Sequence, residues 1–302
     1  MSLNKPLLKL RDCVDLNKSY VSRLSLNPNA IDFLQKNPSL IDWFYLSANP
    51  EAIEILEANQ DKIDWSMLSS NPNAIKLLEK NPSKINWSQL SSNPNAIELL
   101  KKIPLPKKIC TFGLSTNPKA INILKLLVNM DPDRGVNWHG LSLNPAAIKL
   151  LEANPRRINW NLLSANPAAI ELLMKNPEKI HWPSLCCNEN PKALKMLEKN
   201  KDKIDWSQLS SNPSAIKLLE DNPNKIDWKH LSRNQAAIEL LMKNLDKVSW
   251  YQLYSNPAIF ELDYKAMMRE NERLYEELIR EVMNPRRIFK YPDCDLIELF
   301  FE

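Results

Sequence analysis

The apolar positions of the chain recur in a fixed order with a period of 22 residues. Residues 65–86 show one complete period, whose apolar positions follow the i, i+3, i+4 spacing of a short amphipathic helix. These positions are Ala74, Ile75, Leu77 and Leu78. Asn71 can cap this helix, and Pro72 suits its first position, where a missing N–H costs nothing. The pattern predicts a helix of about nine residues that ends at Asn81 and Pro82, because the residue before proline avoids the helical region.

A second, shorter helical segment completes the period. Ile85 leads into it, Asn86 can cap it, and residues 87–90 form one or two turns of α or 3₁₀ helix. Neither helix is stable alone, because isolated helices shorter than ~12–15 residues are marginal in water. Stacking of each unit on the next supplies the missing burial, so the pattern predicts an all-α solenoid.

An asparagine, usually followed by proline, marks about eleven such units. The marking residues are Asn27, Asn49, Asn71, Asn93, Asn117, Asn144, Asn166, Asn190, Asn212, Asn234 and Asn256. All nine tryptophans fall in one slot of the unit. They are Trp43, Trp65, Trp87, Trp138, Trp160, Trp182, Trp206, Trp228 and Trp250. Each follows a buried-type Ile or Val by two residues, which favours a position inside the core over an exposed ladder of stacking rings. Two residues are inserted near Cys187 to Glu189.

The two ends of the chain depart from the repeat. We expect residues 1–20 to form an N-terminal cap, residues 21–262 the solenoid, and residues 263–302 a C-terminal helical cap. A long charged helix begins at Tyr264 and ends near Met283. Its expected buried stripe consists of Tyr264, Met268, Tyr275, Leu278 and Val282.

Composition narrows the possible functions. The chain of 302 residues has 44% hydrophobic residues, enough for a sizeable core, but only 3 Gly, far below the average usage of roughly 7%. Loops that hold phosphates or dinucleotides need glycine for close backbone approach, so such sites are nearly excluded. The net charge of +4 is too small to argue strongly for nucleic acid or a membrane surface.

Cysteine usage and the chain's start suggest a reducing compartment. The five cysteines are Cys13, Cys110, Cys186, Cys187 and Cys294, and they show no C-x-x-C spacing. Residues 1–10 lack the apolar core of a secretory signal, and no apolar run is long enough to span a membrane. We therefore expect a soluble protein of the cytoplasm.

Candidate catalytic residues do not converge. His139, His181 and His230 occupy different columns of the repeat, with no Cys or carboxylate at ligand spacing. A serine follows the leucine of the L-S pair in most units, whereas a catalytic nucleophile would be expected at one place only. Asp42, Asp64, Asp205 and Asp227 are expected helix caps. We expect no catalytic residue, metal ligand, cofactor or small-molecule substrate, and hence no enzyme.

Two columns remain as candidate surfaces. A basic residue precedes the Ile or Val of most units, and stacking would align these side chains about 10 Å apart. This basic column consists of Lys62, Lys84, Lys108, Arg157, Lys179, Lys203, Lys225 and Lys247. The two residues after the tryptophan slot vary between units, and a position free to vary in a stacked array is an exposed one. From these positions we select a candidate partner-binding rim of Phe44, Tyr45, Met67, Gln89, Gln208, His230, Tyr251 and Gln252.

Two resemblances add to this picture. The unit, with its Asn-Pro caps, is similar in architecture to the leucine-rich variant repeat, a right-handed solenoid of α and 3₁₀ helices. Residues 68–75, L-S-S-N-P-N-A-I, resemble more closely the tandem repeat L-S-x-N-P-x-A-I-x-L-L-x-x-N-P-x-x-I-x-W of proteins from giant DNA viruses of the mimivirus and algal-virus sort. This resemblance covers about residues 21–290. It implies a right-handed α-solenoid and a viral source, located in the host cytoplasm or virus factory, and lends no established activity.

The function that these patterns favour is a non-catalytic protein–protein interaction scaffold. It would bind a viral or host protein along the solenoid surface, without a membrane. The alternative is a nucleic-acid-binding repeat protein that uses the basic column on the phosphate backbone. Base reading would need a comparable pair of polar residues in each unit, and the variable positions include Phe, Pro, Gly, Leu and Met.

Overall fold

The computed structural model describes residues 6–102, 109–131 and 135–282. The chain divides into two compact units, Arg11–Ile259 and a smaller one that joins Met1–Leu10 with Phe260–Glu302. Within the described ranges the only strands are β1 (Leu8–Leu10) and β2 (Phe260–Leu262), and helices make up most of the rest. The all-α repeat class is therefore confirmed. The hand of the solenoid, the number of repeats and the division into caps at residues 20 and 263 stay predictions.

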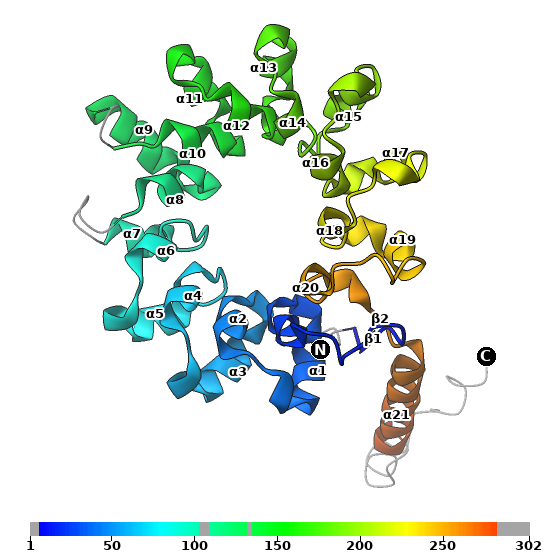
Figure 1. Ribbon diagram of the computed structural model, residues 1–302. Coiled ribbons are helices and arrows are strands. Elements are labelled where there is room, and N and C mark those ends of the chain that lie inside the picture. Colours follow the sequence, from blue (N-terminus) through cyan, green and yellow to red (C-terminus); the bar gives the residue numbers. More distant parts are fainter. Residues whose placement is uncertain (1–5, 103–108, 132–134, 283–302) are drawn as a thin grey trace, which may run out of the picture. The chain divides into compact units, whose positions relative to one another are not determined.

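Most repeats of the larger unit contribute an inner and an outer α-helix, and Figure 1 shows the inner helices on the inside of a ring. The inner helices start at the tryptophan slot. They are α2 (Trp43–Ala48), α4 (Trp65–Ser70), α6 (Trp87–Leu90), α8 (Thr111–Thr116), α10 (Trp138–Leu143), α12 (Trp160–Ser164), α14 (Trp182–Leu185), α16 (Trp206–Ser210), α18 (Trp228–Leu231) and α20 (Trp250–Leu253). In the first repeat the 3₁₀ helix η1 (Val21–Leu26) takes this place.

The outer helices start at the isoleucine of the repeat, except for α15. They are α1 (Ile31–Lys36), α3 (Ile53–Ala58), α5 (Ile75–Lys80), α7 (Ile97–Lys101), α9 (Ile121–Met130), α11 (Ile148–Glu152), α13 (Ile170–Met174), α15 (Pro191–Glu198), α17 (Ile216–Glu220) and α19 (Ile238–Met242). In most repeats the Asn-Pro segment before this helix is a separate 3₁₀ turn such as Pro145–Ala147. The predicted nine-residue helix is therefore a 3₁₀ turn followed by a short α-helix. Between inner and outer helices, Leu163, Ala169 and Leu173 are fully buried, as the apolar pattern predicts.

The marking asparagines form a buried ladder between repeats. Asn71 Oδ1 accepts the backbone N–H of Asn73 at 3.0 Å, which confirms the predicted cap. Asn71 Nδ2 donates to the backbone oxygens of Ser47 at 3.1 Å and Asn49 at 2.8 Å in the preceding repeat. The side-chain amide is thereby satisfied on both sides although it is fully buried. The further members that donate to the preceding repeat are Asn49, Asn93, Asn117, Asn144, Asn166, Asn188, Asn212, Asn234 and Asn256.

Asn188 takes the ladder position that the sequence pattern had given to Asn190. Asn188 is fully buried and its Nδ2 donates to Ser164 O at 2.9 Å. Asn190 instead caps the lengthened outer helix α15. The two-residue insertion therefore follows Asn190 and does not lie at residues 187–189. The prediction was wrong because the Asn-Pro pair that marks other repeats occurs here two residues after the ladder asparagine.

The ladder continues from the last repeat to the first, and this closes residues 11–259 into a ring (Figure 1). Asn27 Nδ2 donates to Tyr254 O at 3.1 Å and to Asn256 O at 2.9 Å. Asn29 Nδ2 donates to Pro257 O at 3.0 Å. We call this contact between the first and last repeats the seam. The two ends of the repeat array cover each other there, whereas the sequence analysis expected separate caps over an open array.

Tyr254 strengthens the seam where other repeats have the recurrent serine. The Tyr254 side chain is fully buried, and its phenolic O–H donates to Asp15 O at 2.6 Å. Elsewhere the serine hydroxyl donates within its own helix and accepts from the next repeat, as Ser232 Oγ accepts the N–H of Ser249 at 2.9 Å. The larger side chain thus reaches the segment that precedes the first repeat.

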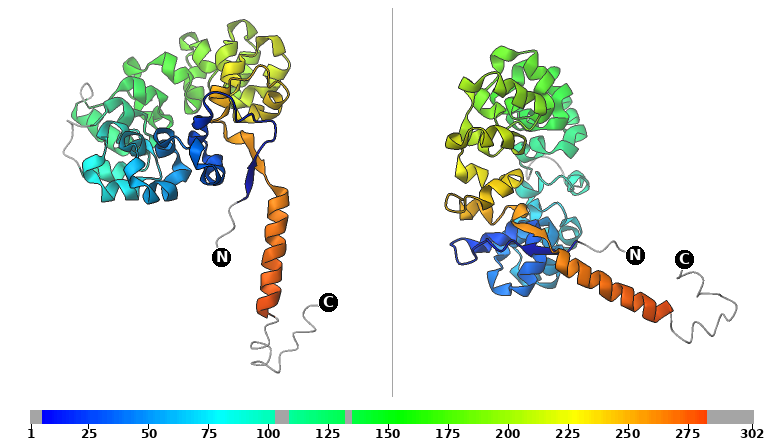
Figure 2. Two further views of the ribbon diagram at one scale, coloured as in Figure 1. Left: turned by 60° about the horizontal axis from the view of Figure 1, so that its bottom comes forward. Right: turned by 90° about the vertical axis from the view of Figure 1, so that its right-hand side faces the viewer.

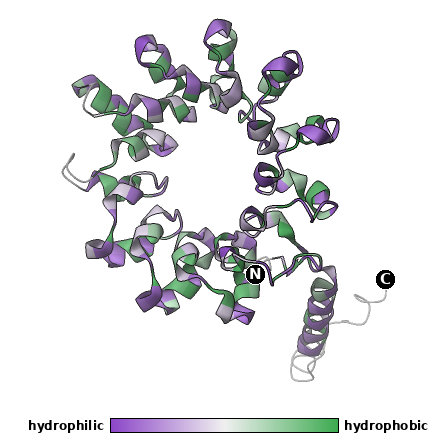
Figure 3. Ribbon diagram, in the orientation of Figure 1, coloured by the Kyte–Doolittle hydropathy of each residue, from purple (hydrophilic) through white to green (hydrophobic). Residues whose placement is uncertain are grey.

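The smaller unit consists of a two-stranded antiparallel sheet and α21 (Tyr264–Val282). Leu8 pairs with Leu262, and Lys9 forms an ion pair with Glu261 at 3.1 Å. Figure 2 shows α21 as one long helix, and Figure 3 shows hydrophobic and hydrophilic residues mixed along it. The predicted buried stripe was wrong. Its described members, Tyr264, Met268, Tyr275 and Leu278, are all exposed, and the Val282 side chain lies outside the described residues.

Seam closure should be measurable in the free energy of unfolding. In the ring, Asn27→Ala leaves two buried carbonyl oxygens without a donor, at a cost of about 2–4 kcal/mol. Asn71→Ala, which removes the same two kinds of hydrogen bond at a ladder position away from the seam, is the control and should cost a similar amount. Urea denaturation measures both. A cost for Asn27→Ala far below that for Asn71→Ala would contradict closure, because an open array gives Asn27 no acceptors.

Alkaline pH should weaken the seam through Tyr254. Burial, assisted by the charge of Asp15, raises the pKa of Tyr254 to about 12. The folded state therefore holds the phenolic proton more tightly than the unfolded chain, so the stabilisation is complete below pH ~10 and is lost as the pH rises towards 12. Thermal unfolding of wild type and Tyr254→Phe between these pH values should show the steeper loss in wild type. Equal slopes would contradict the assignment.

Candidate interaction surface

All eight residues of the candidate rim lie on inner helices of the ring. Phe44 and Tyr251 are 49% and 39% exposed, Gln89 is also exposed, and the others are half-buried. The inner helices carry these side chains because the apolar leucine of each helix turns to the core, which leaves the two residues after the tryptophan slot on the other side. The geometry therefore gathers the rim residues on the inside of the ring, spread over several repeats.

Gly113 and Gly140 are exceptions to the rule that variable positions are exposed. Both are buried, on the adjacent helices α8 and α10. A Cβ atom at Gly140 would lie 2.9 Å from Phe112 O and 3.0 Å from Ser115 Cβ. At these two positions the variation serves close helix packing.

Ring closure brings aromatic residues from the two ends of the repeat array around one arginine. The Arg23 guanidinium lies 3.9 Å from the centre of the Tyr251 ring and 5.2 Å from that of Tyr45. Tyr20 packs edge-on against Tyr251 with ring centres 5.2 Å apart, and Phe44 packs edge-on against Tyr45. Sequence reasoning selected Phe44, Tyr45 and Tyr251 and missed Tyr20 and Arg23. The signal was present, because Val21 aligns with the tryptophan slot and Arg23 with the second variable position.

The basic column packs on the tryptophan column. Lys179 Nζ lies 4.6 Å from the centre of the Trp160 ring, one repeat earlier. Lys62, Lys84, Arg157, Lys203 and Lys247 lie over the tryptophan of their preceding repeat at 4.5–5.7 Å. Lys225 is exposed, and Lys108 lies outside the described residues. All nine tryptophans are half-buried, so the expectation that they lie fully inside was too strong. Each cation covers the part of a ring that the core leaves open.

Ser207, Asp227 and His230 form a cluster that has the residue types of a catalytic triad. Ser207 Oγ donates to Asp227 Oδ2 at 2.8 Å and lies 3.1 Å from His230 Nδ1, which is itself 3.0 Å from Asp227 Oδ2. Serine and carboxylate therefore contact the same ring nitrogen, whereas a proton relay uses both nitrogens. The cluster also shows that His230 has a carboxylate neighbour, which the sequence analysis had overlooked.

Asp227 serves as a helix cap, as predicted. Its Oδ1 accepts the backbone N–H of His230 at 3.0 Å. Burial opposes ionisation of this carboxyl group, but the hydrogen bonds from the His230 backbone and the Ser207 hydroxyl prevail and lower its pKa. Asp42, Asp64 and Asp205 cap their inner helices in the same way. These carboxylates are engaged with backbone donors.

The adjacent thiols Cys186 and Cys187 are not activated. Burial raises the pKa of Cys186 to about 11 and also raises that of Cys187, so both thiols stay protonated near neutral pH. Cys13, Cys110, Cys186 and Cys187 are free. In the part of the chain that the structure describes, no three His, Cys, Asp or Glu side chains gather as a metal site.

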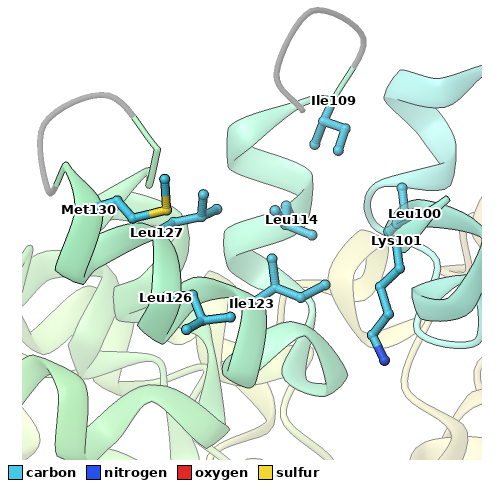
Figure 4. Close-up of a pocket in the computed structure, with 8 residues that line it drawn as sticks. All are labelled: Leu100, Lys101, Ile109, Leu114, Ile123, Leu126, Leu127 and Met130. Atoms are coloured by element: carbon cyan, nitrogen blue, oxygen red, sulfur yellow. The ribbon is translucent and has the colours of Figure 1, made fainter. Parts of the chain in front are cut away.

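An apolar pocket of about 370 Å³ lies between α7, α8 and α9 (Figure 4). Leucine, isoleucine and methionine side chains line it, and Met130 at its edge is 81% exposed. Among the described lining residues Lys101 alone is charged, but its ammonium pairs with Glu98 at 2.7 Å, and Figure 4 shows its side chain extending away from Ile109. The described lining therefore offers no convergent polar groups to orient a ligand.

Comparison with family models, curated proteins and solved structures finds no match to this chain. No helix among the described residues is both long and apolar enough to cross a membrane. The proposals for this surface therefore rest on the geometry of this chain alone.

The contact between the basic and tryptophan columns can be tested by a double-mutant cycle. Trp160→Ala should cost about 2–3 kcal/mol, below the range for a fully buried aromatic ring, because the side chain is half-buried. Lys179→Ala should couple to it by about 0.5–1 kcal/mol, the usual strength of an exposed cation–π contact. Urea denaturation of the two single variants and the double variant gives the coupling. If the free-energy costs of the two single variants simply add in the double variant, Lys179 does not interact with the Trp160 ring.

Proposed function

We propose that the chain is a non-catalytic interaction scaffold that binds a viral or host protein through the inside of its ring. The observation that carries this proposal is that different positions of the repeat have different roles. Buried asparagine, serine and leucine columns hold the ring together, while the rim side chains, which vary between repeats and are exposed or half-buried, lie on the inner helices. Solenoid repeats commonly present such positions as an extended binding surface.

The character of the inner side chains also supports a protein partner. Aromatic residues such as Phe44 and Tyr251 are typical anchors of protein interfaces, and Gln89 and Gln208 offer both donors and acceptors. Neighbouring repeats differ in these side chains, so a partner would meet a different set of contacts at each step. A surface of this kind suits one shaped protein segment better than a uniform polymer.

Nucleic acid remains the alternative partner. The contact of six basic-column residues with tryptophan rings gives them a structural role without nucleic acid, which weakens the argument from the column. Their charges still lie at the surface. Backbone binding through them would show a steep dependence on salt, with a log–log slope near −0.9 per phosphate contact on duplex DNA.

The proposal is tested by affinity capture from infected host cells with matched variants. The rim variant Phe44→Ala, Met67→Ala, Gln89→Ala should lose the captured protein, because all three side chains lie on inner helices. The control variant Leu126→Ala, Met174→Ala, Glu98→Ala removes comparable exposed side chains from outer helices and should retain it. Circular dichroism checks that both variants stay folded. Retention by the rim variant and loss by the control would overturn the inner surface as the binding site.

A further inference from the structure

Acidic side chains are absent from the inner segments of the ring. Neither η1 nor any of the ten inner helices contains Asp or Glu. Two of these segments carry a basic residue, Arg23 on η1 and Lys229 on α18, and Arg233 lies two residues after the end of α18. The outer helices, by contrast, carry both signs, as in the pair between Lys80 of α5 and Glu57 of α3. The inner helices therefore carry positive charge and no carboxylate within their own bounds, while Asp42, Asp64, Asp205 and Asp227 cap four of them.

The three basic residues lie on the two sides of the seam, Lys229 and Arg233 in the repeat of α18 and Arg23 in that of η1, with the repeat of α20 between them. Ser249, the residue before α20, donates to Ser232 behind α18 at 2.9 Å, which stacks these two repeats. Arg23 of η1 then lies over the ring of Tyr251 in α20. We call Arg23, Tyr45, Lys229, Arg233 and Tyr251 the seam sector. Ring closure assembles it from residues more than 200 positions apart in the chain.

The charges of the seam sector are not neutralised by the described chain. No carboxylate of the described residues forms an ion pair with Arg23, Lys229 or Arg233, and Arg23 Nε is buried without a hydrogen-bond partner. The nearest capping carboxylates, Asp42 and Asp227, accept hydrogen bonds from their own helices. Lys229 and Arg233 are exposed and available to a partner.

We propose that the seam sector binds an extended acidic segment of a partner protein. The inference rests on the proposed function and names the chemistry of the partner. Two packing steps separate α18 from η1, roughly 20 Å at 8–10 Å per step. About six residues of extended chain span that length, so carboxylates near both ends of such a segment reach Lys229 or Arg233 and Arg23. Charge complementarity selects the acidic partner, and the Tyr45 and Tyr251 rings receive its apolar side chains.

A polypeptide fits the sector better than a nucleic acid. A nucleic-acid backbone carries one negative charge at every nucleotide, so it is best neutralised by a continuous row of cations along its path. The described inner segments outside the seam sector contain no further Lys or Arg. An acidic segment needs countercharges only at its carboxylates, which a short cluster of three cations supplies.

Fluorescence anisotropy with a labelled random copolymer of glutamate and tyrosine tests the proposal on the full chain. Wild type should bind this probe with an affinity that falls as salt rises. Lys229→Glu, Arg233→Glu should weaken binding about tenfold or more, because it places like charge against the probe. The control, Lys217→Glu, Lys243→Glu, makes the same charge change outside the inner helices and should bind as wild type does. Thermal unfolding confirms that both variants are folded.

Three outcomes would overturn the proposal. These are no binding of the copolymer, equal loss in the control variant, and tighter binding of a single-stranded oligothymidylate or a lysine–tyrosine copolymer than of the acidic probe. The capture experiment separates this failure from that of the proposed function. A partner that is lost by the inner rim variant but retained by Lys229→Glu, Arg233→Glu would leave the scaffold intact and remove only its acidic specificity.

Discussion

The structure depends on one buried hydrogen-bonding group, the side-chain amide of the marking asparagine. Its oxygen caps the turn of its own repeat, and its nitrogen reaches two backbone oxygens of the repeat before. A buried amide that loses these partners carries the full cost of desolvation, so each repeat is stable only when its neighbour is in place. An open array would leave the first asparagine without acceptors and the last carbonyls without a donor. The ring removes both deficits at once.

Because the ladder and the leucine columns occupy the interior, the remaining side chains divide between two environments. Those on the outer helices are charged and mixed in sign, as a solvated surface requires. The basic residue before the Ile or Val covers a half-buried tryptophan ring, and its aliphatic stem supplies contact while its ammonium stays wet. On the inner helices, the two positions after the tryptophan slot belong neither to the ladder nor to the leucine columns.

The repeat period revealed the helices, their caps and the apolar core, since each follows from local spacing. The cap roles of Asn71 and Asp227 are examples that the structure confirms. Curvature is different, because it comes from small rotations between stacked units that no single unit encodes. The sequence could therefore not predict the closure through Asn27, nor the contact between Arg23 and Tyr251 that depends on it. The stripe of α21 failed for a related reason: an apolar period shows that a helix has a face, and not that a partner within the chain covers it.

Closure also changes what binding at the seam means energetically. Residues on either side of the seam come from the two ends of the larger unit, so a ligand that touches both is bound only by the closed ring. Such a ligand stabilises closure by mass action, to a degree set by its concentration relative to its dissociation constant. Conversely, the seam hydrogen bonds of Asn27 and Tyr254 hold Arg23 and Tyr251 in place without a partner, which would lower the entropy cost of the proposed binding. A substitution that opens the seam would therefore also lower partner affinity, whereas loss of an exposed contact residue such as Lys229 would lower affinity and leave the free ring closed.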